Sequence, residues 1–328
     1  MIQVSATAIE QLHKPVSDSG SQAFEQDFSV WTQQVAGRTL RGYYSTPPVA
    51  DTDQPQICWL HGNGFNSRAY APILQALIRP AENSPGFSGF SVFTTDIPGH
   101  GLSAAPARRW PHWRSMAKTV EQAMVQQCAD QPARRRVGVG HSLGAILTLL
   151  QAHQHSDRFE RILLLDPVLF PRNIMMAQQT LKILGLWDRM PLPKATRKRS
   201  SQWDSRELMQ QQLAEKGFYR GWHPEALHGY VRGGHRATAT GVELSCAPEW
   251  EARIFASYPT RLMQAIKQVK IPVHIICASN SFPFVLSGAR RAASLNPNIS
   301  YQLWGEGHCF PMEQAQATAA LVRHWLEE

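Results

Sequence analysis

Short apolar runs that alternate with helical segments constrain the fold of this chain more than any other feature. The runs Ile57–Leu60, Phe90–Thr95 and Arg161–Leu165 are each bounded by Gly or Pro. Continuous runs of this kind are typical of strands buried on both faces of a parallel sheet. Between them, Ala69–Ile78 and Leu143–Gln154 have the apolar spacing of helices. The alternation predicts an α/β fold, with a mainly parallel sheet and helices on both of its faces.

The same pattern extends toward both ends of the chain. Two segments with alternating apolar residues, Phe24–Val35 and Arg38–Ser45, predict paired strands joined by a turn at Ala36-Gly37. Further strands are predicted at Val137–Val139, Val273–Cys277 and Ile299–Trp304, and further helices at Trp113–Cys128 and Glu313–Leu326.

The middle of the chain breaks the alternation. Between about Leu169 and Lys270, several segments have helical spacing and we expect no strand between them. These segments are Leu181–Trp187, Ser205–Lys216, Pro224–Val231 and Pro248–Tyr258. A helical insertion between two strands is best interpreted as a lid or cap over the C-terminal edge of the sheet. We therefore predict a first core part at residues 1–168, a helical cap at 169–270 and a second core part at 271–328.

Positive charge is concentrated in that middle segment. The chain has 33 Lys and Arg against 25 Asp and Glu, a net charge of +8. Pro167 to Lys270 holds 16 of the basic and 8 of the acidic residues, so it carries the whole surplus. We find no nucleic-acid-binding motif and expect no nucleic-acid partner. We interpret the charge as a solubilising surface; the alternative is that it guides anionic substrates, or contacts a membrane surface.

Other features bear on location and cofactors. No apolar stretch approaches the ~20 residues that span a bilayer, and the N-terminus lacks the pattern of a secretory signal. The five cysteines are scattered, without a C-x-x-C pair, which argues against a disulfide framework and a zinc site. We therefore expect a cytoplasmic protein with no metal or other cofactor.

The segment Gly140-His141-Ser142-Leu143-Gly144 carries the clearest chemical signal. It lies between a predicted strand and a predicted helix. In that setting, a G-x-S-x-G segment holds its serine on a sharp, strained turn, and the glycines let strand and helix approach closely. The hydroxyl then stands at a helix N-terminus, where developing negative charge is favoured. We predict Ser142 as a nucleophile.

A serine hydroxyl needs a base, and a tetrahedral oxyanion needs two donors. The candidate base is His308, which follows the last predicted strand. The candidate donors are the backbone N–H of Leu143 and that of Asn63, in the loop His61–Gly64. The side chain of Asn63 is a possible additional donor.

These motifs, in this order, resemble the α/β-hydrolase superfamily. The resemblance rests on His61–Gly64, Asp96–Ser103, Gly140–Gly144 and Gly307-His308, and it covers the core, residues ~24–168 and ~271–328. It implies an α/β-hydrolase fold with Ser142 and His308 in catalytic roles and with Asp96 in a structural one. Haloalkane dehalogenases and epoxide hydrolases of this superfamily use an acidic nucleophile, so Ser142 disfavours them.

One departure concerns the acid that orients the histidine. Members of the superfamily usually carry it after the strand that follows the cap, where this chain has Ser281. Some members supply it from the end of the preceding strand, where this chain has Asp166 before Pro167. We predict Asp166 as the acid that orients His308. The alternatives are that Asp166 only caps the turn before Pro167, or that Glu306 is the acid.

The cap is rich in aromatic residues, which we expect to form its own core and an apolar acyl pocket. They include Trp187, Trp203, Trp222, Trp250, Phe218, Tyr219 and Tyr230. Glu249 or Glu251 is a candidate for positioning a substrate, and a solvated helix face is the alternative.

The function that this pattern favours is a serine hydrolase that cleaves a carboxylic ester of an apolar acyl group through an acyl-enzyme intermediate. A C–C bond hydrolase, a thioesterase and an acyltransferase would use the same residues. The missing acid at Ser281 also leaves open a non-catalytic, ligand-binding member.

Overall fold

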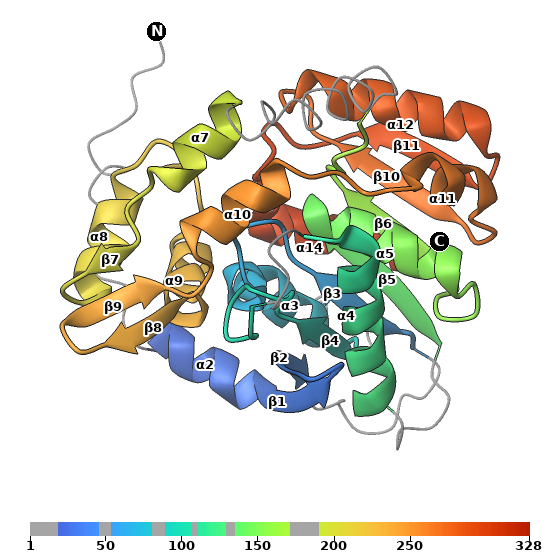
Figure 1. The fold of residues 1–328 in the computed structure, drawn as a ribbon. Coiled ribbons are helices and arrows are strands. Elements are labelled where there is room, and N and C mark those ends of the chain that lie inside the picture. Colours follow the sequence, from blue (N-terminus) through green and yellow to red (C-terminus); the bar gives the residue numbers. More distant parts are fainter. Residues whose placement is uncertain (1–18, 46–53, 81–88, 106–110, 129–134, 171–189) are drawn as a thin grey trace, which may run out of the picture.

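A twisted sheet with helices on both faces forms the centre of the molecule (Figure 1). The computed structural model describes residues 19–45, 54–80, 89–105, 111–128, 135–170 and 190–328. The eight strands lie in the order β1-β2-β4-β3-β5-β6-β10-β11. Their bounds are β1 Phe28–Val35, β2 Arg38–Ser45, β3 Gln56–Leu60, β4 Val92–Thr95, β5 Arg136–His141, β6 Arg161–Leu165, β10 Val273–Cys277 and β11 Ile299–Leu303.

The predicted α/β class and mainly parallel sheet are confirmed. Only β1 with β2 and β2 with β4 pair antiparallel, and the other neighbours in this sheet pair parallel. The helices are α2 Ser19–Asp27, η1 Ser67–Tyr70, α3 Ala71–Ile78, α4 Trp113–Gln127, α5 Leu143–Gln154, α7 Pro191–Arg197, α8 Arg206–Ala214, α9 Pro224–Gly233, α10 Pro248–Phe255, α11 Leu262–Gln268, α12 Pro283–Leu295, α13 Phe310–Glu313 and α14 Ala315–Glu327.

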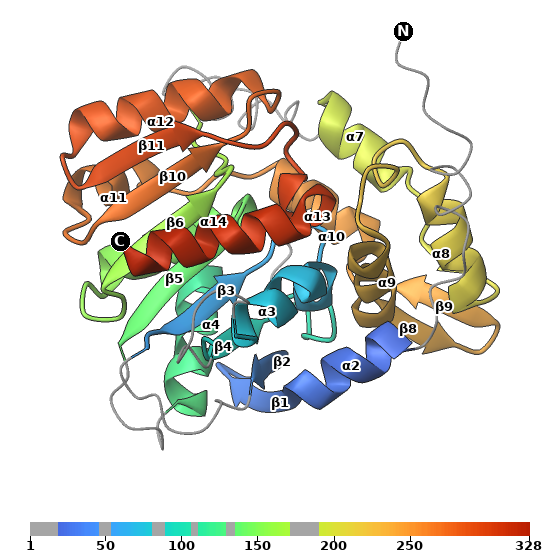
Figure 2. The ribbon, with the colours of Figure 1, turned by 180° about the vertical axis from the view of Figure 1, so that it is seen from behind.

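Two apolar cores cover the two faces of the sheet. In β6, Ile162 and Leu164 face a core with α4, α5, α11 and α12, whereas Leu163 and Leu165 face a core with α3 and α14. Helices α4 and α5 lie in front of the sheet in Figure 1, and α3 and α14 lie in front of it in the reverse view of Figure 2. Burial on both faces explains why the central strands are continuous apolar runs.

The first predicted strand begins four residues later than its apolar pattern indicates. Phe24 belongs to α2, and its ring stacks on that of Phe28 at a centroid distance of 4.6 Å. The two residues are four apart, which is also the spacing of one helix face. The spacing of these two residues therefore fits both a strand and a helix. In the structure Phe24 lies in a helix, and its ring packs against that of Tyr43 in β2.

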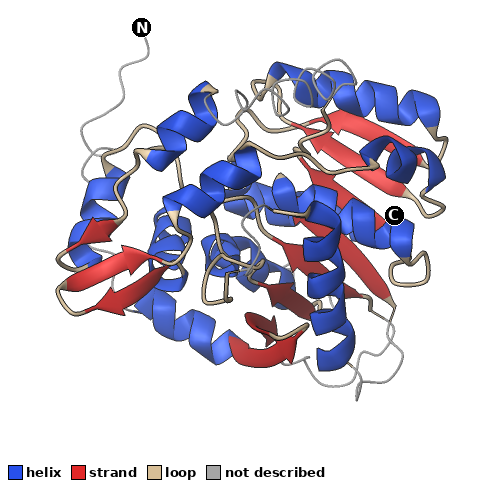
Figure 3. Cartoon of the chain, in the orientation of Figure 1, coloured by secondary structure: helices blue, strands red, loops and turns tan. Residues whose placement is uncertain are grey.

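The segment between β6 and β10 contains strands as well as helices, so the expectation that no strand lies between its helices is wrong. We call its described part, residues 190–270, the insertion. Besides α7 to α11 it has a three-stranded antiparallel sheet, visible at the lower left of Figure 3, in the order β7-β9-β8. These strands are β7 Gln202–Trp203, β8 His235–Thr238 and β9 Gly241–Leu244. Most of their side chains are exposed or half-buried, and such strands have no apolar run that the sequence would show.

Two further predictions concern this segment. The predicted helix Leu181–Trp187 lies outside the described residues. The sequence also predicts an exposed loop for the basic run Lys194–Arg199; its first four residues instead belong to α7, which begins with Pro191 at a position that favours helix starts.

Contact between α9 and η1 joins the insertion to the core. The backbone at Gly229 passes so close to η1 that an added Cβ would lie 2.0 Å from the carbonyl oxygen of Arg68. Nearby, the side chain of Asn66 donates to the carbonyl oxygen of Tyr230 at 2.9 Å. The insertion is therefore packed backbone to backbone on the helical turn that follows β3.

Replacing Gly229 with alanine should loosen this contact. Alanine favours a helix over glycine by about 1 kcal/mol, but the clash with a backbone oxygen should cost about 1–3 kcal/mol. We expect a lower Tm for Gly229→Ala in thermal unfolding followed by circular dichroism. Gly217→Ala is the matched control, because an added Cβ there meets nothing within 4 Å. Equal Tm values for the two variants would contradict the proposed close packing.

Candidate active site

Ser142 occupies a strained turn between β5 and α5. Its φ of 54° and ψ of −112° are unfavourable for a residue with a side chain. The two glycines of the motif make room for the turn. An added Cβ on Gly140 would lie 2.5 Å from the backbone of Gly144, and one on Gly144 would lie 2.3 Å from the carbonyl oxygen of Leu60. The local sequence thus permits strand and helix to meet at the serine.

The structure brings Ser142, His308 and Asp166 into one chain of contacts. The Ser142 Oγ lies 3.0 Å from Nε2 of His308, and Nδ1 of His308 lies 2.6 Å from Oδ2 of Asp166. Ser142 follows β5, Asp166 follows β6 and His308 follows β11. Carboxyl ends of parallel strands meet at one edge of a sheet, which explains why residues so far apart in sequence converge.

Asp166 is fully buried and has a donor at each contact. Its Oδ1 accepts from the backbone N–H of Ala278 at 2.8 Å, and its Oδ2 accepts from the hydroxyl of Ser281 and from His308. A buried carboxylate requires such partners. Its side-chain contacts are thus with the end of β10 and with His308, not with the turn at Pro167. Glu306 is exposed and is not the carboxylate that contacts His308.

Ser281 therefore has a partner that the sequence did not reveal. It stands where the superfamily usually carries its acid, and its hydroxyl donates to the acid that β6 supplies instead. Sequence reasoning treated this position only as a missing charge. The one signal was that its side chain is polar and small enough to fit beside a neighbouring carboxylate.

Two backbone N–H groups that the sequence predicts as oxyanion donors have no acceptor among the described residues. Within the described residues, the N–H groups of Leu143 and Asn63 donate to no protein acceptor. Leu143 is the first residue of α5, where N–H groups have no partner in the helix. The side chain of Asn63 has other partners: Nδ2 donates to the carbonyl of Glu251 at 3.2 Å, and Oδ1 lies 3.2 Å from Nε2 of His100. This amide is therefore engaged in joining the loop to α10.

Glu251 is buried against the same loop, and it is not on a solvated helix face. Its carboxylate accepts from Arg199 at 2.5 Å, and it lies so near Gly64 that an added Cβ there would be 2.4 Å from Oε1. Arg199 also donates to the hydroxyls of Tyr219 and Tyr230 at 3.0 and 2.8 Å. Burial raises the pKa of Glu251, although the positive charge of Arg199 opposes this effect. The predicted alternative, Glu249, pairs with two arginines at the surface, Arg197 and Arg253.

Aromatic rings flank the site. The Phe282 ring lies 5.0 Å from the His308 imidazole and is 40% exposed, and Phe218, 55% exposed, lies 6.2 Å from Phe65 of the loop after β3. Five other aromatic residues of the predicted cap are buried. They are Trp203, Trp222, Trp250, Tyr219 and Tyr230, and Trp187 lies outside the described residues.

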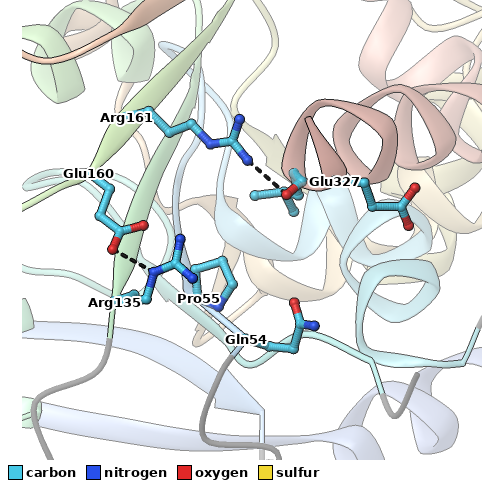
Figure 4. Close-up of a pocket in the computed structure, with 7 residues that line it drawn as sticks. Gln54, Pro55, Arg135, Glu160, Arg161 and Glu327 are labelled. Carbon is cyan, nitrogen blue, oxygen red and sulfur yellow. Dashed lines mark hydrogen bonds and ion pairs between the residues drawn. The ribbon is translucent and has the colours of Figure 1, made fainter. Parts of the chain in front are cut away.

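A cavity of about 410 Å³ lies at the opposite edge of the sheet, near the amino ends of β3, β5 and β6 (Figure 4). There, Arg135 pairs with Glu160 at 2.6 Å, and Arg161 donates to the carbonyl of Leu326 at 2.7 Å. These polar groups are thus hydrogen-bonded to other protein groups. Ser142 follows the opposite, carboxyl end of β5, so the cavity is not part of its site. We do not assign chemistry to this cavity.

Metal sites, membrane-spanning helices and disulfide bonds are absent from the described residues. They contain no group of three or more His, Cys, Asp or Glu side chains arranged to hold a metal ion. None of the helices in these ranges is both long and apolar enough to cross a membrane. The five cysteines are free and buried.

Three buried histidines near the site are held neutral. Burial lowers the pKa of His141 to about 3 and that of His100 to about 4, and it lowers the pKa of His61 well below its usual value. Burial also raises the pKa of Asp96 to about 6, although the N–H groups of Ser67 and Leu102 oppose this effect. Asp96 accepts both of these N–H groups, which agrees with the structural role that the resemblance implies.

Acid should destabilise the fold between pH 6.5 and pH 4. The unfolded chain binds protons on these histidines below about pH 6.5 and the folded chain does not, so stability is fully present above pH 6.5 and falls as the pH drops. In that window, each histidine lowers the free energy of unfolding by about 1.4 kcal/mol for each pH unit of acidification. Below about pH 6, Asp96 has the opposite effect, because the folded chain protonates it before the unfolded chain does. It is one group against three histidines, so the fold still loses stability. Urea midpoints at several pH values measure the slope. His324→Gln, at an exposed histidine, should keep the slope, and a flat profile would contradict the assignment.

Known proteins resemble the chain in sequence and in fold. It is 26% identical over 176 residues to the type I acyl-CoA thioesterase mpaH of Penicillium roqueforti (strain FM164), a match that covers 51% of this chain and 36% of that protein. The chain thus spans about a third of the length of the curated relative it matches.

Solved structures share the fold along almost the whole chain. E-2-(acetamidomethylene)succinate hydrolase superposes with a TM-score of 0.67 at 18% identity, covering 92% of this chain and 100% of that one. The peroxisomal alpha-beta-hydrolase Lpx1 of Saccharomyces cerevisiae superposes with a TM-score of 0.71 at 14% identity, covering 92% and 89%. The model of the alpha/beta hydrolase family matches residues 59–321. Because that match runs from β3 to α14, across both parts of the sheet, the chain belongs to the alpha/beta hydrolase family.

Proposed function

We propose that this protein is a serine hydrolase that cleaves a carboxylic ester of an apolar acyl group through an acyl-enzyme intermediate. The observation that carries the proposal is the chain of contacts from Ser142 through His308 to Asp166. The N–H groups of Leu143 and Asn63, which have no acceptor among the described residues, support it. A nucleophile, a base, an orienting acid and two oxyanion donors are the groups that acyl transfer requires.

In the proposed reaction, each group has one step. Nε2 of His308 accepts the proton of Ser142 as Oγ attacks the carbonyl carbon and the carbonyl electrons move onto oxygen. The N–H groups of Leu143 and Asn63 donate to that oxyanion. When the tetrahedral intermediate collapses, the imidazolium returns the proton to the leaving alcohol. Water then repeats the sequence on the acyl-enzyme and releases the acid and free Ser142.

Asp166 supports both halves of the reaction. Its Oδ2 accepts from Nδ1 of His308, which leaves Nε2 as the acceptor for the serine proton. A fully buried carboxylate also stabilises the imidazolium that forms in each step. The exposed ring of Phe282 beside His308 favours an apolar acyl group. The buried free cysteines suit a reducing compartment, and we propose a cytoplasmic location.

Variants at the acid and at the nucleophile test this proposal. Asp166→Asn should lower kcat for p-nitrophenyl esters by about 10⁴-fold, because the imidazole loses the tautomer that the serine needs. Ser142→Ala should abolish both turnover and labelling by a fluorophosphonate. Glu306→Gln is the control and should keep the kcat of the unaltered chain. Full activity in Asp166→Asn would contradict the assignment, and an unaltered chain that neither labels nor turns over would favour a ligand-binding member.

A thioester is the second candidate substrate class, and two observations favour it. The relative described above is named an acyl-CoA thioesterase. The residues from Pro167 to Lys270 also carry the whole positive surplus of the chain, which suits the phosphates of coenzyme A.

The salt dependence of kcat/KM distinguishes thioesters from carboxylic esters as the substrate class. If the positive segment binds the coenzyme, kcat/KM for an acyl-CoA should fall several-fold between 20 and 300 mM salt, since screening weakens charge steering. For the p-nitrophenyl ester of the same acyl chain, it should change little. A ratio of the two kcat/KM values that ignores ionic strength would leave the charge without a role in substrate selection.

A further inference from the structure

We propose that Tyr70 and His141 are positioning residues that connect the oxyanion loop to the loop of the base. This inference rests on the proposed function. The two side chains form a hydrogen-bonded relay from the backbone N–H of Gly62 to the backbone carbonyl of His308. The relay fixes the distance between the donors that receive the oxyanion and the imidazole that moves the proton.

Each contact of the relay is short and comes from a different element. The N–H of Gly62, just after β3, lies 3.0 Å from the Tyr70 hydroxyl of η1. That hydroxyl lies 2.7 Å from Nδ1 of His141, the last residue of β5. Nε2 of His141 lies 2.8 Å from the carbonyl oxygen of His308.

The chemistry of the partners gives the relay one direction. The carbonyl of His308 can only accept, so Nε2 of His141 carries a proton and donates it. Burial holds the pKa of His141 far below neutrality, so its other nitrogen, Nδ1, has no proton and accepts from the Tyr70 hydroxyl. The Tyr70 oxygen then accepts from the N–H of Gly62. Every donor in this series has one acceptor, and reversal of any member would set two donors or two acceptors against each other.

Burial makes the relay hard to replace. The side chains of Tyr70 and His141 are fully buried, so bulk water does not reach their polar atoms. The ring of Phe65, from the loop after β3, lies parallel to the His141 imidazole at 6.2 Å. Removal of one member would therefore leave a buried polar group without a partner, and the loops would shift to satisfy it.

The ends of the relay are next to groups with assigned steps. Gly62 precedes Asn63, whose N–H is one of the proposed oxyanion donors, and His308 is the proposed base. These groups act on the same carbonyl, but they lie in loops after β3 and after β11. Small errors in the placement of such groups lower the rate strongly, whereas the binding of an apolar acyl group depends on them little.

Tyr70→Phe tests the relay with the least disturbance, because it removes one hydroxyl and keeps the ring. We expect kcat for p-nitrophenyl butyrate to fall about 10–100-fold and KM to change less than about twofold. A trifluoromethyl ketone, which binds as a tetrahedral adduct, should lose affinity to a similar degree. Tyr43→Phe is the matched control: Tyr43 is also buried, on β2, and its loss of a hydroxyl should change neither quantity.

A second pair of variants separates positioning from packing. His141→Gln retains a neutral donor and acceptor, whereas His141→Leu retains only apolar bulk. We expect the glutamine variant to keep a kcat at least tenfold above that of the leucine variant. Equal values in these two variants, or a Tyr70→Phe variant with lower Tm but unchanged kcat and ketone affinity, would overturn the inference.

Hydrogen–deuterium exchange gives a readout that does not depend on turnover. In Tyr70→Phe, amides of residues 61–65 and 305–309 should exchange faster together, since both loops lose the same connection. Unchanged exchange in either loop would overturn the relay. An unaltered chain that cleaves no ester would refute the proposed function alone, because the coupled exchange would still be observed.

Discussion

One buried carboxylate holds the carboxyl edge of this sheet in its working arrangement. Asp166 is fully buried, and it accepts from Ala278 and Ser281 at the end of β10 and from His308 after β11. Three strand ends therefore converge on a single charge, because an unpartnered carboxylate would be far too costly at this depth. The backbone N–H of Asp166 also donates to Ile276 of β10, which continues the sheet up to the charge. The position of the imidazole follows from this arrangement.

The insertion is part of the site and not only a cover. Asn63 joins the loop after β3 to α10 through the carbonyl of Glu251, and Trp250 of the same helix donates to the carbonyl of Pro98. The buried pair of Glu251 and Arg199 lies against Gly64, where a side chain would not fit. The backbone that presents the free N–H of Asn63 is thus held by residues that stand almost two hundred positions later in the chain.

The sequence predicted the parts of this protein that leave a local pattern. The buried strands were visible as apolar runs, and the serine turn was visible because two glycines must flank it. Asp166 was inferred only because the superfamily has two places for an acid and the usual one is occupied by Ser281. The strands of the insertion were missed because few of their residues are buried. The roles of Tyr70 and His141 leave no pattern, since their partners are backbone atoms of distant loops.

The contact between Ser281 and Asp166 brings together the two strand ends from which an acid can reach His308. The Ser281 hydroxyl and the His308 imidazole both contact Oδ2 of Asp166. The side chain at position 281 is therefore one hydrogen bond away from the oxygen that faces the imidazole. A carboxylate on either strand end would present its charge to nearly the same point. In this chain the acid beside His308 comes from the end of β6, and the strand end that the superfamily usually uses supplies a hydroxyl that donates to that acid.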